Sequence, residues 1–361
     1  MKKLLFIGHA FHNKTKSSQF FQDLLASEYD VEKFDFDPYS DSPELFAKLR
    51  GRHYDVVVLW QILPHIRVLK KYITWDRIAF CPMYDSFPKF TDTIWFGYRK
   101  CNIINFSKAL HKKCVEYGFS SFYIQYFPAP AEVMDWGDTE SIFLWQRTRY
   151  ITADTLEQIV DTNAVKHLYF HAVPDPEHQI TEPSDKWRGK VTRSTWFDSK
   201  DDLVRHIQKS AIYIAPRRYE GIGMSFLDAM ATGRCVIAVD EPTMNEYITN
   251  GENGYLYSLD NPQEIDIRDV RRIQKNTYEY IKQGHKQWER EKNKVFEWLQ
   301  TDPLENADIE KLNRFYRFKL IKPAIKHLIK NTFSVTKIKP DQDEYRALIL
   351  FGLRIKLRKI S

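Results

Sequence analysis

Short apolar runs alternate with helical patterns along the first 127 residues. The apolar runs predict strands at residues 3–8, 31–37, 55–60, 78–85, 101–107 and 122–127. Apolar residues at helical spacing predict helices at 17–29, 42–51 and 107–118. Strands that alternate with helices in this order are typical of a mostly parallel, doubly wound sheet.

A second series of the same kind follows a boundary within residues 129–140. It predicts strands at 141–146, 167–172, 211–215, 235–240 and 255–259, with helices at 154–162, 199–210 and 225–233. We therefore expect an α/β protein with two Rossmann-like domains that face each other across a cleft, at residues 1–135 and 136–303. Residues 304–361 would form a crossover helix and a basic tail. Ligands of such sheets bind beyond the C-terminal ends of the strands.

The composition agrees with this plan. A length of 361 residues suits two domains of about 150 residues each, and 43% hydrophobic residues are ample for two cores. The apolar runs, such as 56–60, are too short to cross a bilayer, and residues 1–12 indicate a first strand rather than a signal peptide. The four cysteines form no C-x-x-C pair. Reduced thiols and a cytoplasmic location are expected.

The positive charge of the chain belongs to its C-terminal end. Residues 311–361 hold 14 Lys/Arg and 3 Asp/Glu, whereas the other 310 residues hold 40 basic and 45 acidic side chains. Residues 319–333 alternate apolar and basic positions at helical spacing, which favours an anionic membrane surface, where each Lys or Arg adds roughly 1 kcal/mol. The alternative is a helix that crosses back onto the first domain. We expect no nucleic-acid partner, because no aromatic-basic module is present.

The segment after the strand at 211–215 has the composition of a ligand site. It contains Arg217, Arg218, Glu220, Gly221 and Gly223 directly before a helix. Glycines allow the backbone close to a ligand, and a helix N-terminus and arginines suit phosphate. A carboxylate accepts hydrogen bonds from sugar hydroxyls. Groups for phosphate beside a group for hydroxyls predict a nucleotide-sugar site.

Residues 220–238, with the pattern E-G-x-G-x-x-x-L-D-A-M-A-x-G-x-x-V-I-A, resemble the donor-site motif of GT-B glycosyltransferases, in particular retaining family 4, the group 1 glycosyl transferases. Residues 245–265, 104–118 and 143–147 resemble further motifs of that family. The resemblance implies the GT-B fold and transfer of a sugar with retention of configuration.

The same resemblance assigns roles to individual residues. Glu220 would contact hydroxyls of the transferred sugar, and Asp228, eight residues later, would hold the ribose of the nucleotide. Arg147 would hold the diphosphate. The family's diphosphate lysine falls on Thr152, so its charge would have to come from Arg149, Arg217 or Arg218. The remaining donor contacts would come from Ile222, Met224, Asn245 and Glu246.

Simpler interpretations of some of these residues stay open. Asp228 could only cap a helix that begins at Ser225, in an S-x-x-D box. The carboxylate of Glu220 could be a solvated loop residue, and Arg149 and Arg217 could be ordinary surface residues.

The loop after the first strand should form the acceptor side of the cleft. His9, His12, Lys14, Thr15 and Ser17 are candidates for contacts with the acceptor or with phosphate. The alternative is an exposed polar loop. After the strand at 78–85, Asp85 could orient the acceptor hydroxyl or be a turn residue.

No metal or cofactor is expected. The D-x-D at residues 35–37 and the H-x-x-H at 9–12 are weak metal signals, because no third ligand is placed. The predicted function is transfer of a sugar from a nucleotide sugar to a lipid-linked or oligosaccharide acceptor, at the inner face of the cell membrane. The rivals are a GT-B scaffold protein without turnover, and a nucleotide-sugar epimerase, whose added acid and base groups cannot be placed.

Overall fold

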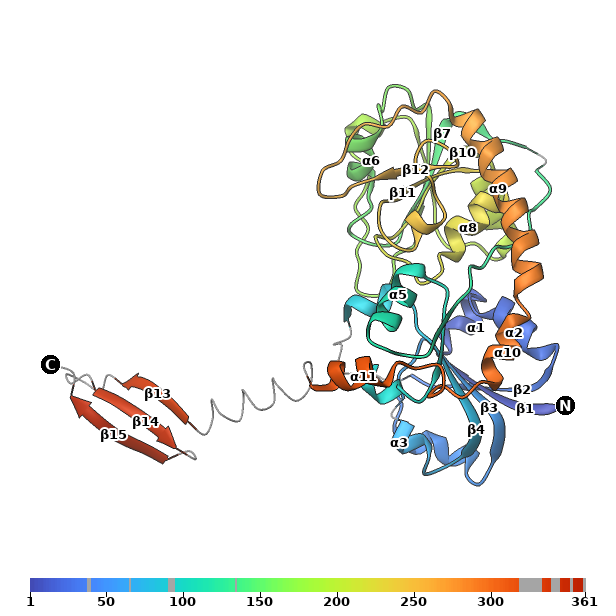
Figure 1. Cartoon of the computed structure of the whole chain (residues 1–361). Helices are drawn as coiled ribbons and strands as arrows, with labels where there is room; N and C mark the ends of the chain where they lie inside the picture. Colours follow the sequence, from blue (N-terminus) through green and yellow to red (C-terminus); the bar gives the residue numbers. More distant parts are fainter. Residues whose placement is uncertain are drawn as a thin grey trace.

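The computed structural model describes residues 1–37, 40–64, 66–89, 95–133, 135–317, 333–338, 345–350 and 353–359. It consists of two six-stranded parallel sheets, one in each half of the chain, and a three-stranded antiparallel sheet near the C-terminus (Figure 1). The two parallel sheets confirm the predicted α/β fold.

The first sheet has the strand order β2-β1-β3-β4-β5-β6. Its strands are β1 (Lys2–Gly8), β2 (Tyr29–Asp35), β3 (His53–Trp60), β4 (Thr74–Cys81), β5 (Asn102–Asn105) and β6 (Ser121–Tyr123). The helices of this half are α1 (Phe11–Thr15), α2 (Gln19–Ala26), α3 (Ile66–Leu69) and α5 (Lys108–Glu116), with 3-10 turns η1 (Pro43–Leu49), η2 (Tyr84–Lys89) and η3 (Phe96–Tyr98). The buried run in β3 is central, as its continuous apolar sequence predicts.

The second sheet has the order β12-β11-β10-β7-β8-β9. Its strands are β7 (Asp138–Gln146), β8 (His167–Ala172), β9 (Val191–Ser194), β10 (Ser210–Ile214), β11 (Cys235–Val239) and β12 (Tyr255–Tyr257). It is accompanied by α6 (Ala153–Ile159), α7 (Lys200–Gln208), α8 (Met224–Ala231), η4 (Asp185–Trp187) and η5 (Met244–Glu246).

Each strand order reverses direction once, and these reversals fix where ligands can bind. In the second sheet the chain moves outward on one side from β7 to β9, and then on the other side from β10 to β12. The loops that leave β7 and β10 therefore run to opposite sides of the sheet, and ligands of such sheets bind at this reversal, beyond the carboxyl edge. In the first sheet the equivalent place lies between β1 and β3.

The chain returns to the first domain through a long helix. The 22-residue α9 (Val270–Glu291) runs along the second domain toward the first, and α10 (Lys294–Gln300) follows (Figure 1). Asn102 in β5 donates to the carbonyls of Trp298 (3.1 Å) and Thr301 (2.8 Å). We predicted that the chain would cross back to the first domain from residue 304 onward. It crosses back earlier, because α10 already covers the first sheet. α11 (Ile309–Tyr316) also packs there through Leu312 and Phe315.

A buried arginine closes the end of the second sheet that is opposite to the ligand edge. Arg234 is 0% exposed and donates to the carbonyls of Asp135, Gln208, Ser210 and Thr232 at 2.6–3.2 Å. Burial lowers the pKa of Arg234 to about 10. The side chain thus ties the linker between the domains to the starts of two strands.

The C-terminal sheet consists of β13 (Phe333–Ile338), β14 (Tyr345–Leu350) and β15 (Leu353–Lys359). Residues 353–359 alternate apolar and basic side chains, a pattern typical of a strand, and β15 covers them, whereas β13 and β14 were not predicted. Residues 319–332, most of the predicted amphipathic helix, lie outside the described residues. In the part of the chain that the structure describes, no helix has the length and apolar character needed to cross a membrane.

Candidate active site

The predicted ligand loop leaves β10 at the reversal of the second sheet. Gly223 adopts a φ of +89° and forms the N-cap of α8, which begins at Met224. A Cβ at this position would lie 1.8 Å from the ring of Phe226, so only glycine fits. Ser225 lies inside the helix, so the capping box that we considered for Ser225 and Asp228 is not formed.

Two arginines are joined by one carboxylate at this reversal. Arg147, directly after β7, donates from Nε (3.0 Å) and Nη2 (2.6 Å) to Oδ1 of Asp175. Arg217, after β10, donates from Nε (2.9 Å) and Nη2 (2.6 Å) to Oδ2 of the same residue. Each guanidinium uses one side of its fork, and the carboxylate orients both arginines.

Glu220 is the buried acid of this cluster. It is 7% exposed, and its Oε1 has no hydrogen-bond partner among the described residues. Its Oε2 lies 3.9 Å from Nη1 of Arg217. Burial raises the pKa of Glu220, and the charges of Arg217 and Arg147 oppose this rise only in part. Such a group is suited to a hydrogen bond with a ligand hydroxyl, because its free oxygen is already desolvated.

The first domain contributes to the same cluster. Oδ2 of Asp85, in η2, lies 3.8 Å from Nη1 of Arg217. A Cβ at Gly221 would meet the side chain of Met83 at 2.8 Å, so this glycine allows the two domains to approach closely. Burial lowers the pKa of Arg217, but the charges of Glu220, Asp175 and Asp85 outweigh that effect and raise it. Arg217 therefore stays charged at this junction.

Three other predicted donor residues lie directly before α8 or on it. Ile222 is buried, and Met224 opens α8. Asp228, half-buried on α8, lies close enough to Tyr126 of the first domain to add to the rise in the pKa of Tyr126, which burial mainly causes.

Three residues that were considered for the diphosphate site make their contacts elsewhere. Arg218 pairs with Glu241 at 3.0 Å, and Arg149 is exposed and donates to the hydroxyl of Tyr150 at 3.1 Å. Neither joins the cluster of Arg147 and Arg217. Thr152 forms a capping box with Thr155 at the start of α6.

The two remaining predicted donor residues, Asn245 and Glu246, make different contacts. Asn245 is exposed and donates to Asp240 at 3.0 Å. Glu246, which we predicted to bind the donor, has both carboxylate oxygens on the N-terminus of α5 in the first domain. Its contacts are therefore made between the domains.

The predicted acceptor-side loop follows β1 and is held largely by its own side chains. His12 shares a hydrogen bond of 2.7 Å with Ser17, and Thr15 donates to Ser17 at 3.1 Å. Lys14 reaches across to the second domain, where its Nζ lies 4.1 Å from the ring centroid of Trp196. Burial, aided by the neighbouring His9, lowers the pKa of His12 to about 4.

Among the described residues, no group of three or more His, Cys, Asp and Glu side chains is arranged to hold a metal ion. His9 pairs instead with Asp37 at 3.4 Å. All four cysteines are buried and free.

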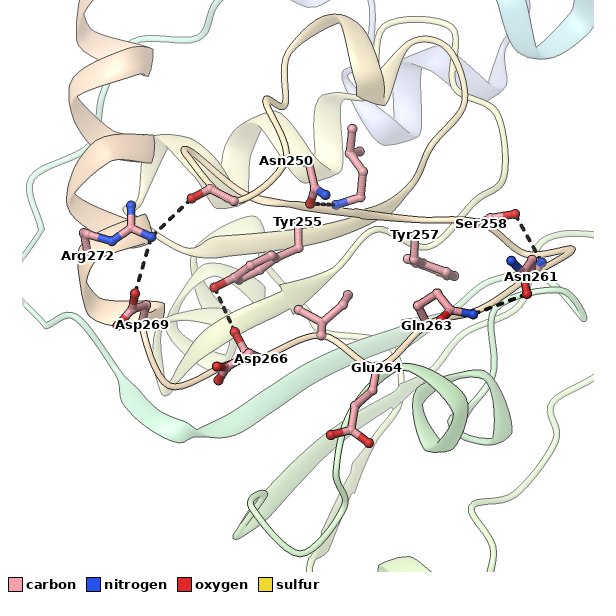
Figure 2. Close-up of a pocket in the computed structure, with 13 residues that line it drawn as sticks. Asn250, Tyr255, Tyr257, Ser258, Asn261, Gln263, Glu264, Asp266, Asp269 and Arg272 are labelled. Carbon is pink, nitrogen blue, oxygen red and sulfur yellow. Dashed lines mark hydrogen bonds and ion pairs between the residues drawn. The ribbon is translucent and has the colours of Figure 1, made fainter.

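A cavity of about 640 Å³ lies elsewhere, beside the edge strand β12 (Figure 2). Tyr255, Asn261, Gln263 and Glu264 are among its lining residues, and Arg272 of α9 closes one end. None of the predicted donor or acceptor residues lines it, so it is separate from the arginine and carboxylate cluster.

Asp175 is the functional candidate that sequence reasoning missed. It lies in the loop after β8, a neighbour of β7 in the sheet. An acidic residue in the loop after a strand next to the reversal was the available signal. That signal gained meaning only once the fold placed Arg147 and Arg217 on either side of it.

Comparisons with known proteins identify one related sequence family and several similar folds. Residues 150–271 match the family model of glycosyl transferases group 1. A stretch of 51 residues is 41% identical to the lipopolysaccharide core biosynthesis mannosyltransferase LpsB of Rhizobium meliloti (strain 1021). This stretch makes up 14% of this chain and 14% of LpsB. The curated relative is thus matched over a small part of its length.

Solved structures resemble the chain over a larger part. HepE of Anabaena, solved with UDP and glucose, has a TM-score of 0.54 at 14% identity, covering 81% of this chain and all of that one. Sucrose-phosphate synthase of Thermosynechococcus elongatus has a TM-score of 0.56 at 14% identity, covering 82% and 100%. The chain has the two-domain GT-B fold, and the domain that surrounds Glu220 matches the family model of the group 1 glycosyl transferases.

Proposed function

We propose that this chain is a retaining glycosyltransferase that moves a sugar from a nucleotide sugar to a glycan acceptor. The observation that carries the proposal is the buried Glu220 carboxyl, with one unpartnered oxygen, beside the paired guanidiniums of Arg147 and Arg217 at the strand-order reversal. A hydroxyl acceptor next to fixed positive charge fits a sugar linked to a diphosphate.

The proposed reaction breaks the bond between the anomeric carbon and the diphosphate oxygen and forms a bond from that carbon to an acceptor hydroxyl. Both events take place on the same face of the sugar, and the hydroxyl proton passes to the departing diphosphate. Arg147 and Arg217 stabilise the charge that develops on the leaving group, and Glu220 orients the sugar. The N-terminus of α8 adds partial positive charge, so no metal enters the proposal.

The acceptor class is a finer part of the proposal. We propose a lipid-linked or oligosaccharide acceptor in the assembly of a cell-surface polysaccharide, at the inner face of the membrane. The similarity to a mannosyltransferase named for lipopolysaccharide core biosynthesis supports this class, as does the excess of basic residues after residue 311. Asp228 on α8 is proposed to hold the ribose of the donor.

A panel of UDP-, GDP-, ADP- and CDP-sugars tests the proposal by calorimetry, with and without EDTA. We expect one nucleotide to bind at a micromolar dissociation constant, to be unaffected by EDTA, and to bind more weakly to Asp228→Ala. Product analysis with that donor then reports whether the anomeric configuration is retained. Failure of every donor to bind to the folded protein would reject the proposal.

A second candidate function is a scaffold subunit without turnover. One observation favours it: the cluster sets three carboxyl groups, on Asp85, Asp175 and Glu220, against the two guanidiniums. A diphosphate would have to compete with that negative charge. The same donor panel separates the two functions, because a scaffold would bind none of its members.

A further inference from the structure

The contact between Glu246 and α5 joins the two domains at one carboxylate. Oε1 of Glu246 accepts from Ser107 Oγ and from the backbone N–H of Ala109, both at 2.9 Å. Oε2 accepts from the backbone N–H of Lys108 at 2.6 Å. The first N–H groups of a helix have no partner within the helix, and its positive end favours an anion. A residue of the second domain thus supplies the hydrogen-bond acceptors that the first N–H groups of this first-domain helix lack.

Two neighbouring contacts hold the same turn against the first domain. Gln125 donates to the carbonyl of Glu246 at 3.0 Å, and the hydroxyl of Tyr247 donates to the carbonyl of Tyr126 at 3.0 Å. Tyr247 is 1% exposed. The turn at η5 is therefore fixed to the first domain by side-chain and main-chain contacts together.

The turn also reaches the candidate active site. Thr243, 0% exposed, donates from Oγ1 to the carbonyl of Glu220 at 3.3 Å. A short chain of contacts therefore runs from the N-terminus of α5 through Glu246 and Thr243 to the backbone of Glu220. A shift of the first domain relative to this turn would be transmitted to the Glu220 loop.

We propose that Glu246 is a positioning residue, which holds the two domains in the arrangement that transfers the sugar and sets the place of Glu220 between donor and acceptor. This inference rests on the proposed glycosyltransferase function. It differs from a role in donor binding, because the hydrogen bonds that the described residues make to the Glu246 carboxylate all come from the first domain.

Three variants test the inference. Glu246→Ala removes all three hydrogen bonds, and Glu246→Gln keeps the shape but removes the charge and turns an NH2 group toward an N–H donor. Ser107→Ala removes the bond that the first domain donates from Ser107 Oγ, together with the N-cap bond of 3.4 Å that Ser107 Oγ accepts from the N–H of Leu110. Glu252→Ala, an exposed glutamate six residues further on, is the matched control.

Steady-state rates and donor affinity are measured separately for each variant. We expect Glu246→Ala to lower kcat by about 10- to 100-fold and Glu246→Gln to lower it less, with the donor Kd within about threefold of the parent. Ser107→Ala combined with Glu246→Gln should cost less than the sum of the two. An unchanged kcat in Glu246→Ala, or a donor Kd that rises as much as kcat falls, overturns the inference.

Amide hydrogen exchange gives a readout that does not need turnover. Loss of Glu246 should speed exchange at Lys108 and Ala109 by about tenfold or more, while Glu252→Ala leaves it unchanged. If the parent protein transfers no sugar, the proposed function fails while this measurement still decides whether Glu246 joins the domains. Unchanged exchange at both amides in Glu246→Ala would reject that role.

Discussion

The loops that carry the predicted site residues form a second-domain wall and a first-domain wall, and the two are held in place in different ways. On the second-domain wall, Asp175 orients Arg147 and Arg217, and these three residues come from three separate loops. Glu220 is buried beside them. On the first-domain wall, the loop after β1 satisfies its polar groups within itself or with the end of β2, as in the bond of 2.9 Å from Asn13 to Asp35. The first arrangement fixes charges in place before a ligand arrives, which suits a constant diphosphate-sugar group. The second leaves an exposed surface, which suits acceptor contacts that are weaker and separately adjustable.

The largest expected effect comes from Glu220→Gln on the second-domain wall. Transfer should fall by about 100- to 1,000-fold, because a buried group that meets the sugar in the transition state is lost. Thermal stability should stay equal or rise, because the pKa of Glu220 is raised by burial and the substitution removes an acid that is costly to ionise there. Initial rates and melting curves check both. Full activity in the variant would remove Glu220 from the site.

Asp175→Asn should weaken donor binding by about tenfold. Without the shared carboxylate, Arg217 is free to turn toward Asp85 and Glu220, whose oxygens already lie 3.8 and 3.9 Å from its Nη1. Calorimetry with the donor measures the loss, at about 1.4 kcal/mol for each tenfold change. Asp185→Asn, at an exposed pair with Arg188, is the control. Tighter donor binding in Asp175→Asn would mean that Asp175 competes with the diphosphate instead of positioning its ligands.

Acid should destabilise both domains through one histidine in each. Burial lowers the pKa of His12 in the first domain and of His171 in the second to about 4, with help from His9 and His206 respectively. The unfolded chain takes up these protons near pH 6.5, so the free energy of unfolding falls as pH drops from about 6.5 to 4, by up to about 1.4 kcal/mol per pH unit for each histidine. Urea unfolding at several pH values measures this slope. His12→Gln should make it shallower, and an equal slope in that variant would show that other groups dominate.

The smallest effect is expected for Lys14→Ala. The contact of Lys14 with Trp196 lies on an exposed ring and is worth about 0.5–1 kcal/mol. We expect the acceptor KM to change by no more than about fivefold and the donor Kd to stay constant, with Lys14→Arg close to the parent. A loss of donor affinity as large as that of Asp175→Asn would show that the two walls do not divide the substrates.

The sequence predicts those parts of the molecule that depend on local pattern. Apolar runs locate the core strands, and the residues around Glu220 mark the ligand loop. β9 escaped prediction, because this edge strand is largely exposed and lacks an apolar run. The choice between Arg217 and Arg218 was also open, since adjacent side chains diverge and only the fold places Asp175 beside one and Glu241 beside the other. Glu246 matched a donor motif, yet the three groups that donate to its carboxylate lie 137–139 residues away in the chain.

The contacts of Arg234 predict which property of the protein a natural variant at this position would change. The planar guanidinium of Arg234 donates hydrogen bonds to four main-chain carbonyls. A lysine carries its three donors on one nitrogen and cannot reach all four carbonyls at once. An Arg234→Lys change would therefore reduce the amount of protein that survives in the cell, while each surviving molecule works normally. A loss of function traced to this position would then reflect a shortage of folded protein rather than a slower molecule.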